Sequence, residues 1–383
     1  MRRFFVARVM QFFRLKNMKK ILIFFVSLLF TLTASATHLD QLKEKINEAI
    51  SKDYIAGVAI CVGDANGIKF SHAQGMAEKG GKIPMATNTI IDVASVTKSV
   101  ATTTALAILQ ERGEIDFDKP FNKYLPQYTP VLKNPPTIRD MALHTSGFIT
   151  SPYWREPTGC AMLKTALSTP PPKAPKEMYK YSCWNFILLG LVVENIAQQP
   201  LRVFCKNEIF QPLGMNDSSL GKPIPNTQDR QARTLTTSKA GEISDPPARA
   251  IYADCRCAGN AGLFTTAIDL SKFCQMMLNK GKLGNVRILS ERMVDEIRKT
   301  GYDNKQGTVR TFGWERSKTS IPDNFSTDMI SHSGWSGQTV FIDFKNNTFA
   351  VVLTVRTGNY INAKKDRRIF AQLAKEAMLE QKK

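Results

Sequence analysis

The sequence predicts a mixed α/β fold (α+β), in which an antiparallel sheet is flanked by terminal helices and a mostly helical lobe is inserted between its strands. Two hairpin patterns lie near opposite ends of the chain, at residues 56–73 and 339–355. Amphipathic helical patterns at residues 39–51 and 367–380 stand outside them. Between the hairpins, residues 115–267 are dominated by helical patterns and loops.

Each hairpin is predicted from strand patterns separated by turn residues. The first joins residues 56–62 to 68–73 through a turn rich in Asp, Asn and Gly. The second joins residues 339–344 to 348–355 around an Asn-Asn turn. Neither an internal repeat nor a flexible linker is visible, so residues 37–383 are predicted to form one domain.

Residues 1–36 are predicted to be an export signal. Two lysines precede an apolar run at residues 21–32, and residues 34–36 provide the small-x-small pattern of signal cleavage. The run is shorter than the roughly 20 apolar residues of a membrane span, although an uncleaved anchor stays an alternative. We therefore expect a periplasmic or secreted protein whose translation starts at Met1 or Met18.

The chain is basic, with a formal net charge of +19, which becomes +12 once the seven Lys and Arg of the predicted signal are removed. For an exported protein this charge favours solubility and weak attraction to anionic envelope polymers or a membrane surface. No basic run is interleaved with aromatic residues, so nucleic-acid binding is not expected.

Cysteine and histidine usage predicts no metal site. Seven Cys is an odd number, which leaves at least one thiol unpaired within a monomer. Cys61 and Cys274 lie in apolar segments and are expected to be buried. Cys255 and Cys257 have no matching second pair, and the chain has four His.

Ser95-Val96-Thr97-Lys98 places a hydroxyl and an amine three residues apart at the start of a helix predicted to run to Gly113. This SxxK spacing puts both side chains on one helix face, and the free N–H groups of a helix start favour negative charge nearby. A serine activated by an adjacent base attacks amide or ester carbonyls. The pattern therefore predicts a nucleophile and its base.

The same spacing occurs by chance elsewhere, at Ser219-Leu220-Gly221-Lys222. Turn residues surround this second match and Pro223 follows it, so it is predicted to be a loop. After Ser95, by contrast, apolar and small residues recur with helical spacing. The threonines at 102–104 are indifferent helix formers, so tertiary burial must hold this helix.

Further motifs follow in order along the chain. Each is weak alone, but their order makes the set specific. They are Ile138-Arg139-Asp140, Leu143-His144-Thr145-Ser146-Gly147, Tyr181-Ser182, Ile187-Leu188-Leu189-Gly190, Pro212-Leu213-Gly214-Met215, Ala258-Gly259-Asn260-Ala261-Gly262-Leu263-Phe264, Asp269-Leu270 and His332-Ser333-Gly334.

With the SxxK pattern, this set resembles the serine β-lactamase and penicillin-binding DD-peptidase superfamily, in its class C and carboxylesterase-like branch. The resemblance covers nearly all of residues 37–383 and implies a β-lactamase/transpeptidase-like fold without a cofactor. It also implies that Ser95 is acylated, that Lys98 and Tyr181 share proton transfer, and that His332 lines the site from an edge strand.

The chemistry requires these residue types for physical reasons. A lysine with a pKa of about 10.4 is a poor base, and burial is expected to lower that pKa. Tyr181 would act as a base only if nearby cations such as Lys98 held its anion, or would relay a proton within a hydrogen-bonded pair. Which of the two is the acylation base stays open.

The oxyanion formed on attack needs two fixed donors. We expect these to be the backbone N–H groups of Ser95 and Trp335, with Gly334 permitting close approach. Each such donor lowers the activation barrier of the reaction by about 3–4 kcal/mol.

Other stretches spell the same motifs. Lys299-Thr300-Gly301 is interpreted as the end of a helix at 291–299 with Gly301 as its C-cap, because His332-Ser333-Gly334 leads directly into a predicted strand. Tyr302-Asp303-Asn304 and Tyr360-Ile361-Asn362 match Tyr-x-Asn but lie in loop-like sequence.

The main departure from the family pattern is Cys183, where Tyr-x-Asn has an amide. A thiol donates and accepts hydrogen bonds only weakly. In the family that asparagine contacts the substrate's acylamide group and the catalytic lysine, so we do not expect efficient β-lactam hydrolysis. Asn185 is expected to point to another side of its helix, and a neutral His332 attracts a carboxylate less than a lysine would.

These observations predict an exported serine hydrolase that forms an acyl-enzyme on Ser95 and acts on small-molecule or peptidoglycan-derived peptides, amides or esters. One alternative is a muramoyl-peptide amidase or carboxylesterase of the same fold. Another is a penicillin-binding or sensing module with poor turnover. The oligomeric state stays open.

Overall fold

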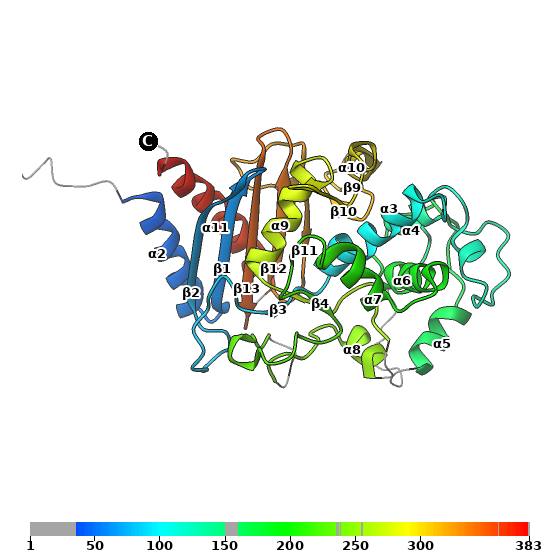
Figure 1. Ribbon diagram of the computed structural model, residues 1–383, viewed down its shortest axis with the longest axis horizontal. Helices are drawn as coiled ribbons and strands as arrows, with labels where there is room; N and C mark the ends of the chain where they lie inside the picture. Colours follow the sequence, from blue (N-terminus) through cyan, green and yellow to red (C-terminus); the bar gives the residue numbers. More distant parts are fainter. Residues whose placement is uncertain are drawn as a thin grey trace, which may run out of the picture.

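The computed structural model describes residues 36–149, 160–234, 237, 239–253, 256–358 and 360–381 (Figure 1). The predicted export signal, apart from its last residue, lies outside these ranges, as does Cys255. Within them, no helix combines the length and apolarity that crossing a membrane requires.

An eight-stranded antiparallel sheet stands at the centre of the molecule. Both predicted hairpins are confirmed, and the first strand of one pairs with the last strand of the other, with Val58 opposite Thr354. Three short strands at the far edge of the sheet were not predicted. In spatial order the strands are β2 (Gly67–Gly75), β1 (Ile55–Asp64), β13 (Thr348–Arg356), β12 (Gln338–Asp343), β11 (Met329–Ser333), β10 (Trp314–Glu315), β9 (Val309–Thr311) and β8 (Thr300–Asp303).

Strand β1 serves two separate cores because successive side chains of a strand point to opposite faces of the sheet. Val58, Ile60 and Val62 belong to the core beneath the terminal helices. Ala59 and Cys61 belong to the larger core beneath the helical lobe. The sheet is therefore covered on both faces.

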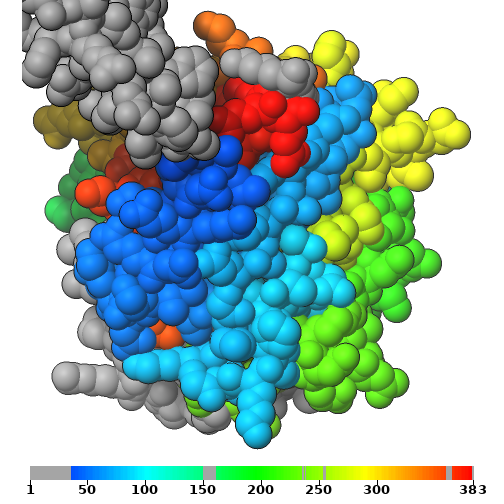
Figure 2. Space-filling model, turned by 90° about the vertical axis from the view of Figure 1, so that its left-hand side faces the viewer, coloured from blue at the N-terminus to red at the C-terminus, as the bar shows by residue number. Residues whose placement is uncertain are grey.

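The terminal helices α2 (His38–Ser51) and α11 (Tyr360–Glu380) pack against each other and on the same face of the sheet. Figure 2 shows the two ends of the described chain side by side on this surface, in blue and red. The His38 ring lies 2.5 Å from the Glu380 carboxylate and 3.5 Å from that of Glu376. Helix α11 begins seven residues before its predicted start.

The opposite face of the sheet carries α9 (Ala267–Leu278) and, beyond it, the helical lobe (Figure 1). The lobe and its surroundings contain α3 (Thr104–Glu111), α4 (Ile138–Ala142), α5 (Cys160–Ser168), α6 (Cys183–Ala197), α7 (Leu201–Cys205), α8 (Pro246–Ala253) and α10 (Glu291–Arg298). Two small sheets are also present, β3 (Ile91–Asp92), β5 (Leu263–Thr265) and β4 (Ser219–Leu220) in one, and β6 (Lys282–Leu283) and β7 (Val286–Arg287) in the other. Short 3₁₀ helices occur at Phe121–Tyr124, Gln228–Arg230 and Lys318–Ser320, and a π-helix occurs at Lys206–Phe210.

The helix predicted after Ser95 is present but is not a regular α-helix. It begins at Val96, widens into a π-helix over Lys98–Thr103 and continues as α3. The hydroxyls of Ser99 and Thr102 donate to carbonyls of other segments, those of Gly313 (2.6 Å) and Gly259 (2.7 Å). Buried hydroxyls need acceptors, and these bonds tie the widened turns to the sheet and to the lobe.

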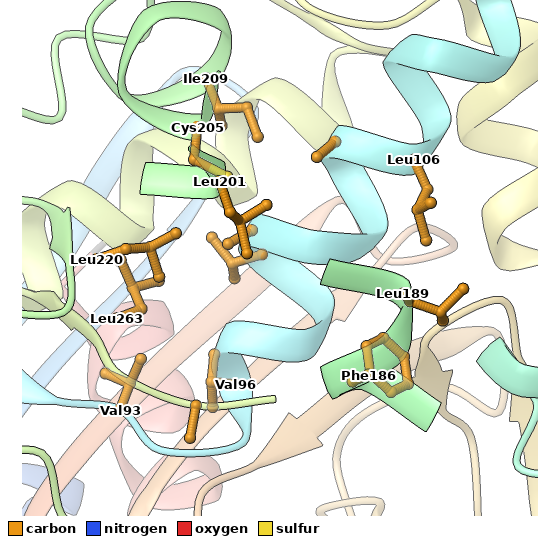
Figure 3. Close-up of a cluster of buried hydrophobic side chains, with 14 of the residues drawn as sticks. Val93, Val96, Leu106, Phe186, Leu189, Leu201, Cys205, Ile209, Leu220 and Leu263 are labelled. Carbon is orange, nitrogen blue, oxygen red and sulfur yellow. The ribbon is translucent and has the colours of Figure 1, made fainter. Parts of the chain in front are cut away.

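This central helix runs through the larger core (Figure 3). Val96 and Leu106 on the helix belong to the same buried cluster as Phe186 and Leu189 of α6 and Leu201 of α7. Tertiary burial, rather than helix propensity, thus holds the threonine-rich segment, as predicted.

Three local predictions are wrong. Helix α10 ends at Arg298 with Lys299 as its cap, and Gly301 lies inside strand β8, where a Cβ atom would meet the Leu143 side chain at 2.6 Å. Tyr302 is likewise in β8 rather than in a loop, and Tyr360 begins α11. A strand as short as β8 has no periodic pattern, so its residues were interpreted from the sequence as a helix cap and a loop.

The contact between the central helix and the sheet predicts a cost for adding one methyl group. At Gly313 (φ +74°) a Cβ atom would lie 1.9 Å from Thr103 Oγ1, so Gly313→Ala should lower the free energy of unfolding by about 2–5 kcal/mol, from left-handed strain and overpacking together. At Gly284 (φ +57°) no atom lies within 4 Å, so Gly284→Ala should cost only the strain, about 1–2 kcal/mol. Urea denaturation measures both, and equal losses would contradict the packing argument.

Candidate functional site

Ser95 and Lys98 lie at the start of the central helix, with their side chains in contact. Lys98 Nζ is 2.9 Å from Ser95 Oγ and donates a second hydrogen bond to the Asn260 carbonyl oxygen at 2.8 Å. Lys98 is fully buried, and Ser95 is 8% exposed. The preceding residue, Ala94, has a left-handed backbone (φ +46°), which turns the chain sharply from strand β3 into the helix.

The pKa of Lys98 is raised, not lowered as predicted. Burial alone disfavours the ammonium form, but Cys183, Tyr181 and Asp245 favour it more strongly, and the net shift is upward. The prediction considered burial without these neighbours. The resting amine is therefore protonated at neutral pH.

Tyr181 stands just before α6 and joins this pair. Its hydroxyl interacts with the side chains of Ser95 and Lys98, and Lys98 Nζ lies 5.2 Å from the centre of its ring. Burial raises the pKa of the Tyr181 phenol, although Lys98 acts in the opposite direction. The phenol is thus neutral in the resting site and is able both to donate and to accept a proton.

His332 lies on β11, which is an interior strand between β12 and β10 and not the expected edge strand. It faces the same group, with its ring centre 6.4 Å from that of Tyr181. It is 3% exposed, and burial together with Arg310 and Lys98 holds its pKa well below the usual value. Nδ1 lies 3.2 Å from the Ser333 carbonyl oxygen, which assigns the proton of the neutral ring to Nδ1. Nε2 is buried and has no hydrogen-bond partner in the part of the chain that the structure describes.

The loop after β11 is tightly held around Gly334. A Cβ atom on Gly334 would lie 2.5 Å from the Val93 carbonyl oxygen, so only glycine fits, as predicted. Arg367 donates to the Gly334 carbonyl oxygen at 3.0 Å, and Arg356 donates to that of Trp335 at 2.5 Å. Among the described residues, neither the Ser95 nor the Trp335 backbone N–H has a backbone or side-chain acceptor, so each is available as a hydrogen-bond donor.

Cys183 opens helix α6 and lies beside Lys98 and Asn260. Burial raises the pKa of its thiol more strongly than Lys98 lowers it, so the thiol is neutral and not a reactive thiolate. Asn185, by contrast, turns away, as predicted: its Oδ1 accepts from Ser146 Oγ at 2.6 Å and its Nδ2 contacts His144 Nδ1 at 3.1 Å.

His144 supports Tyr181 directly, although its sequence motif assigned it no role in the site. The two ring centres are 4.4 Å apart, and His144 Nδ1 accepts the Ser182 backbone N–H at 3.2 Å. Burial and the cations Arg310 and Lys98 hold the pKa of His144 well below its usual value. The sequence motif around His144 was the available signal for this role.

Arg310 is a site residue that could not be predicted from the sequence, because its strand β9 is only three residues long. It is 7% exposed, its Nε donates to the Tyr179 hydroxyl at 2.9 Å, and its guanidinium lies 5.5 Å from the Tyr181 ring centre. Burial opposes its charge, but Glu315 and Tyr179 outweigh burial and raise its pKa. A permanent cation therefore stands beside Tyr181.

The competing motif residues lie elsewhere. Lys299 and Gly301 line a cavity of about 300 Å³ with Asp118 and Arg139, and Ser95 is not among its lining residues. Tyr302 stacks on Tyr179, the partner of Arg310, with ring centres 5.1 Å apart. Among the described residues no cluster of three His, Cys, Asp or Glu is arranged to hold a metal ion.

The chain is similar to several known proteins. A "Putative D-alanyl-D-alanine carboxypeptidase" of Escherichia coli O157:H7 is 26% identical, with 82% of each chain covered. An N-acetylmuramyl-L-alanine amidase of Bacillus subtilis strain 168 is 27% identical, with 81% of this chain and 80% of that protein covered. The solved structure of a penicillin-binding protein homologue from Caulobacter crescentus superposes with a TM-score of 0.72 at 17% identity, over 89% of this chain and 97% of that one. A family model described as Beta-lactamase matches residues 39–374, and the chain therefore belongs to the β-lactamase family of serine hydrolases.

Proposed function

We propose that this protein is an exported peptidase that acylates Ser95 and hydrolyses the acyl-enzyme, acting on cell-wall-derived peptides or on related amides and esters. The observation that carries the proposal is the contact of Ser95 Oγ with Lys98 Nζ at 2.9 Å, with Tyr181 beside both and His332 facing them. The predicted export signal supports the location of such a substrate outside the cytoplasm.

In the proposed acylation step, Ser95 Oγ attacks the substrate carbonyl and loses its proton to Lys98 in its amine form, directly or through the Tyr181 hydroxyl. The backbone N–H groups of Ser95 and Trp335 stabilise the oxyanion. The proton then passes to the leaving amine or alcohol as the tetrahedral intermediate collapses. Water attacks the resulting ester by the same route and restores Ser95.

The charges around the site favour a substrate with a carboxylate near the scissile bond. Arg310 and Lys98 are cations, and each lies within 6 Å of the Tyr181 ring centre, at 5.5 Å and 5.2 Å. The carboxyl-terminal residue of a peptide supplies such a carboxylate, and this favours a carboxypeptidase of D-alanyl peptides over the alternatives. The likeness to an amidase keeps cleavage between muramic acid and its peptide as the second candidate.

Ser95→Ala should lower turnover of muropeptides by at least about 10³-fold, because no nucleophile remains for acylation. Mass spectrometry of the digested muropeptides measures the turnover and also identifies the bond cleaved. Loss of a terminal alanine supports the carboxypeptidase, whereas release of an intact peptide supports the amidase. Ser219→Ala, in the other Ser-x-x-Lys match, should keep full activity, and undiminished turnover by folded Ser95→Ala would refute the proposal.

The rate of acylation should rise with pH. The pKa of Lys98 is raised, so the amine able to accept the Ser95 proton is the minor form at pH 7 and grows about tenfold per pH unit below that pKa. Reaction of Ser95 with a neutral fluorophosphonate probe, followed by intact-protein mass spectrometry from pH 7 to 10, measures this rate. Lys98→Arg should abolish the rise. A flat profile in the unmodified protein would show that Lys98 is not the proton acceptor.

Cys183→Asn should increase hydrolysis of a chromogenic cephalosporin, by about tenfold or more, because an amide beside Lys98 both donates and accepts. Cys183→Ser is the matched control: its hydroxyl is shorter than an amide and should give little gain. Both variants are followed by absorbance. An equal response of the two would mean that an amide at this position does not limit β-lactam turnover.

The same assay tests the non-enzymatic alternative. A penicillin-binding module would retain a fluorescent penicillin on Ser95 without measurable hydrolysis and would also fail to cleave muropeptides. Cleavage of either substrate by the unmodified protein excludes that alternative.

A further inference from the structure

A buried carboxylate, that of Asp92, lies three residues before Ser95 and takes no part in the proton transfers described above. Asp92 is 2% exposed and ends strand β3. Its Oδ1 accepts the backbone N–H of Ala94 at 3.0 Å, and so fixes the left-handed turn that aims Ser95. Its Oδ2 accepts two donors from one residue, the backbone N–H of Ser244 at 2.6 Å and its hydroxyl at 2.5 Å.

The chain of contacts continues into the loop that carries Trp335. Ser244 Oγ lies 3.2 Å from Ser336 Oγ; because the Ser244 proton is given to Asp92, Ser336 shares its one proton between Ser244 Oγ and Gln338 Oε1, which is 2.9 Å away. Gln338 in turn donates to the Thr354 carbonyl oxygen in strand β13 at 3.1 Å. Asp92 thus links the turn before Ser95 to the segment that holds the second expected oxyanion donor.

A second branch reaches the amine. Asp245 follows Ser244, and its Oδ1 accepts Asn260 Nδ2 at 3.2 Å and the Ala248 backbone N–H at 2.9 Å. The backbone carbonyl of Asn260 is the acceptor for Lys98 Nζ. Displacing the loop at residues 243–245 would therefore disturb the support of Lys98 as well as that of Ser336.

The surroundings of Asp92 make its ionisation sensitive to pH. Phe264 from β5 and Ser336 from the loop after β11 are uncharged, whereas the loop at 243–245 contributes the carboxylate of Asp245. Burial raises the pKa of Asp92 to about 6, Asp245 adds to the rise, and the hydrogen bonds from Ser244 and Ala94 oppose it. The carboxyl is ionised at pH 8 and protonated at pH 5.

We propose that Asp92 is a positioning residue whose ionised carboxylate holds the turn of Ser95, the loop at 243–245 and the Trp335 loop in register for acylation. A protonated Asp92 carries its own O–H and cannot accept all three donors. Protonation consequently releases part of this network and slows reaction at Ser95. The inference rests on the proposed acylation of Ser95.

The test is the pH dependence of Ser95 labelling by a neutral fluorophosphonate, measured by mass spectrometry of the peptide that contains Ser95. The labelling rate of the unmodified protein should fall between pH 8 and pH 4.5. Below pH 6 it should fall more steeply than protonation of the Lys98 amine alone predicts. Asp92→Asn should react about 10- to 100-fold more slowly at pH 8, because the amide offers a donor where Ser244 needs an acceptor. It should also lack the extra loss below pH 6.

Asp343→Asn is the matched control. Asp343 is equally buried, and it also accepts a backbone N–H and a hydroxyl from one serine, Ser326. It is the last residue of β12, at the opposite end of that strand from Gln338. Its variant should lose stability while the pH profile of labelling keeps its shape. An Asp92→Asn profile parallel to that of the unmodified protein, with normal labelling of Ser95, would overturn the inference and leave the proposed function intact. Labelling at a residue other than Ser95 would overturn the proposed function instead.

Two further readouts test the inference, and the first needs no substitution at Asp92. Ser244→Ala removes one donor that favours the ionised carboxylate. The decrease in the Ser95 labelling rate at acid pH should therefore begin at a higher pH, and an unchanged pH for this decrease would overturn the inference.

Thermal denaturation gives the second readout. Because the folded-state pKa of Asp92 is raised above its unfolded value, its contribution to stability is present in acid and is lost as the pH rises through about 6. The melting temperature of Asp92→Asn should therefore improve relative to the unmodified protein as the pH rises, while its labelling rate does not recover.

Discussion

The fully buried ammonium group of Lys98 is the constraint on which the site depends. Removing an ammonium from water is costly unless partners replace the lost hydration, and a partner lost on one side leaves an uncompensated charge. The partners of Lys98 come from separate parts of the chain: Ser95 from its own helix, Tyr181 from the segment before α6, and the Asn260 carbonyl from the segment before β5. The lobe and the central helix are thus connected through Lys98 Nζ, the same atom that accepts the Ser95 proton in the proposed reaction.

The large elements of the fold were predictable because their patterns are long. Strands β1 and β13 are buried on both faces and gave continuous apolar runs, and the amphipathic stripe of α2 gave a helical period. Strands β8, β9 and β10 have two to four residues each and carry no period. Their place in the sheet is decided by tertiary contacts, such as that of Gly301 with Leu143, which local sequence does not encode.

The candidate site was likewise predictable where its residues lie in motifs and not where they depend on long-range contacts. Ser95, Lys98, Tyr181 and His332 are brought together as predicted, since each sits in a motif with a fixed place in an element. The pKa direction of Lys98 was wrong because it depends on Asp245 and Cys183, whose proximity is a property of the folded chain. Arg310 was missed for the same reason: it is 131 residues from its partner Tyr179.

The π-helix at Lys98–Thr103 absorbs one residue in the segment that connects Ser95 to the core. A turn closed by i→i+5 bonds holds one residue more than a turn of α-helix. The helical turns on either side therefore keep their relative rotation, so that Ser95 contacts Lys98 while Leu106 stays in the core. Relatives with one residue fewer between these two positions should form a regular α-helix here and keep the same site.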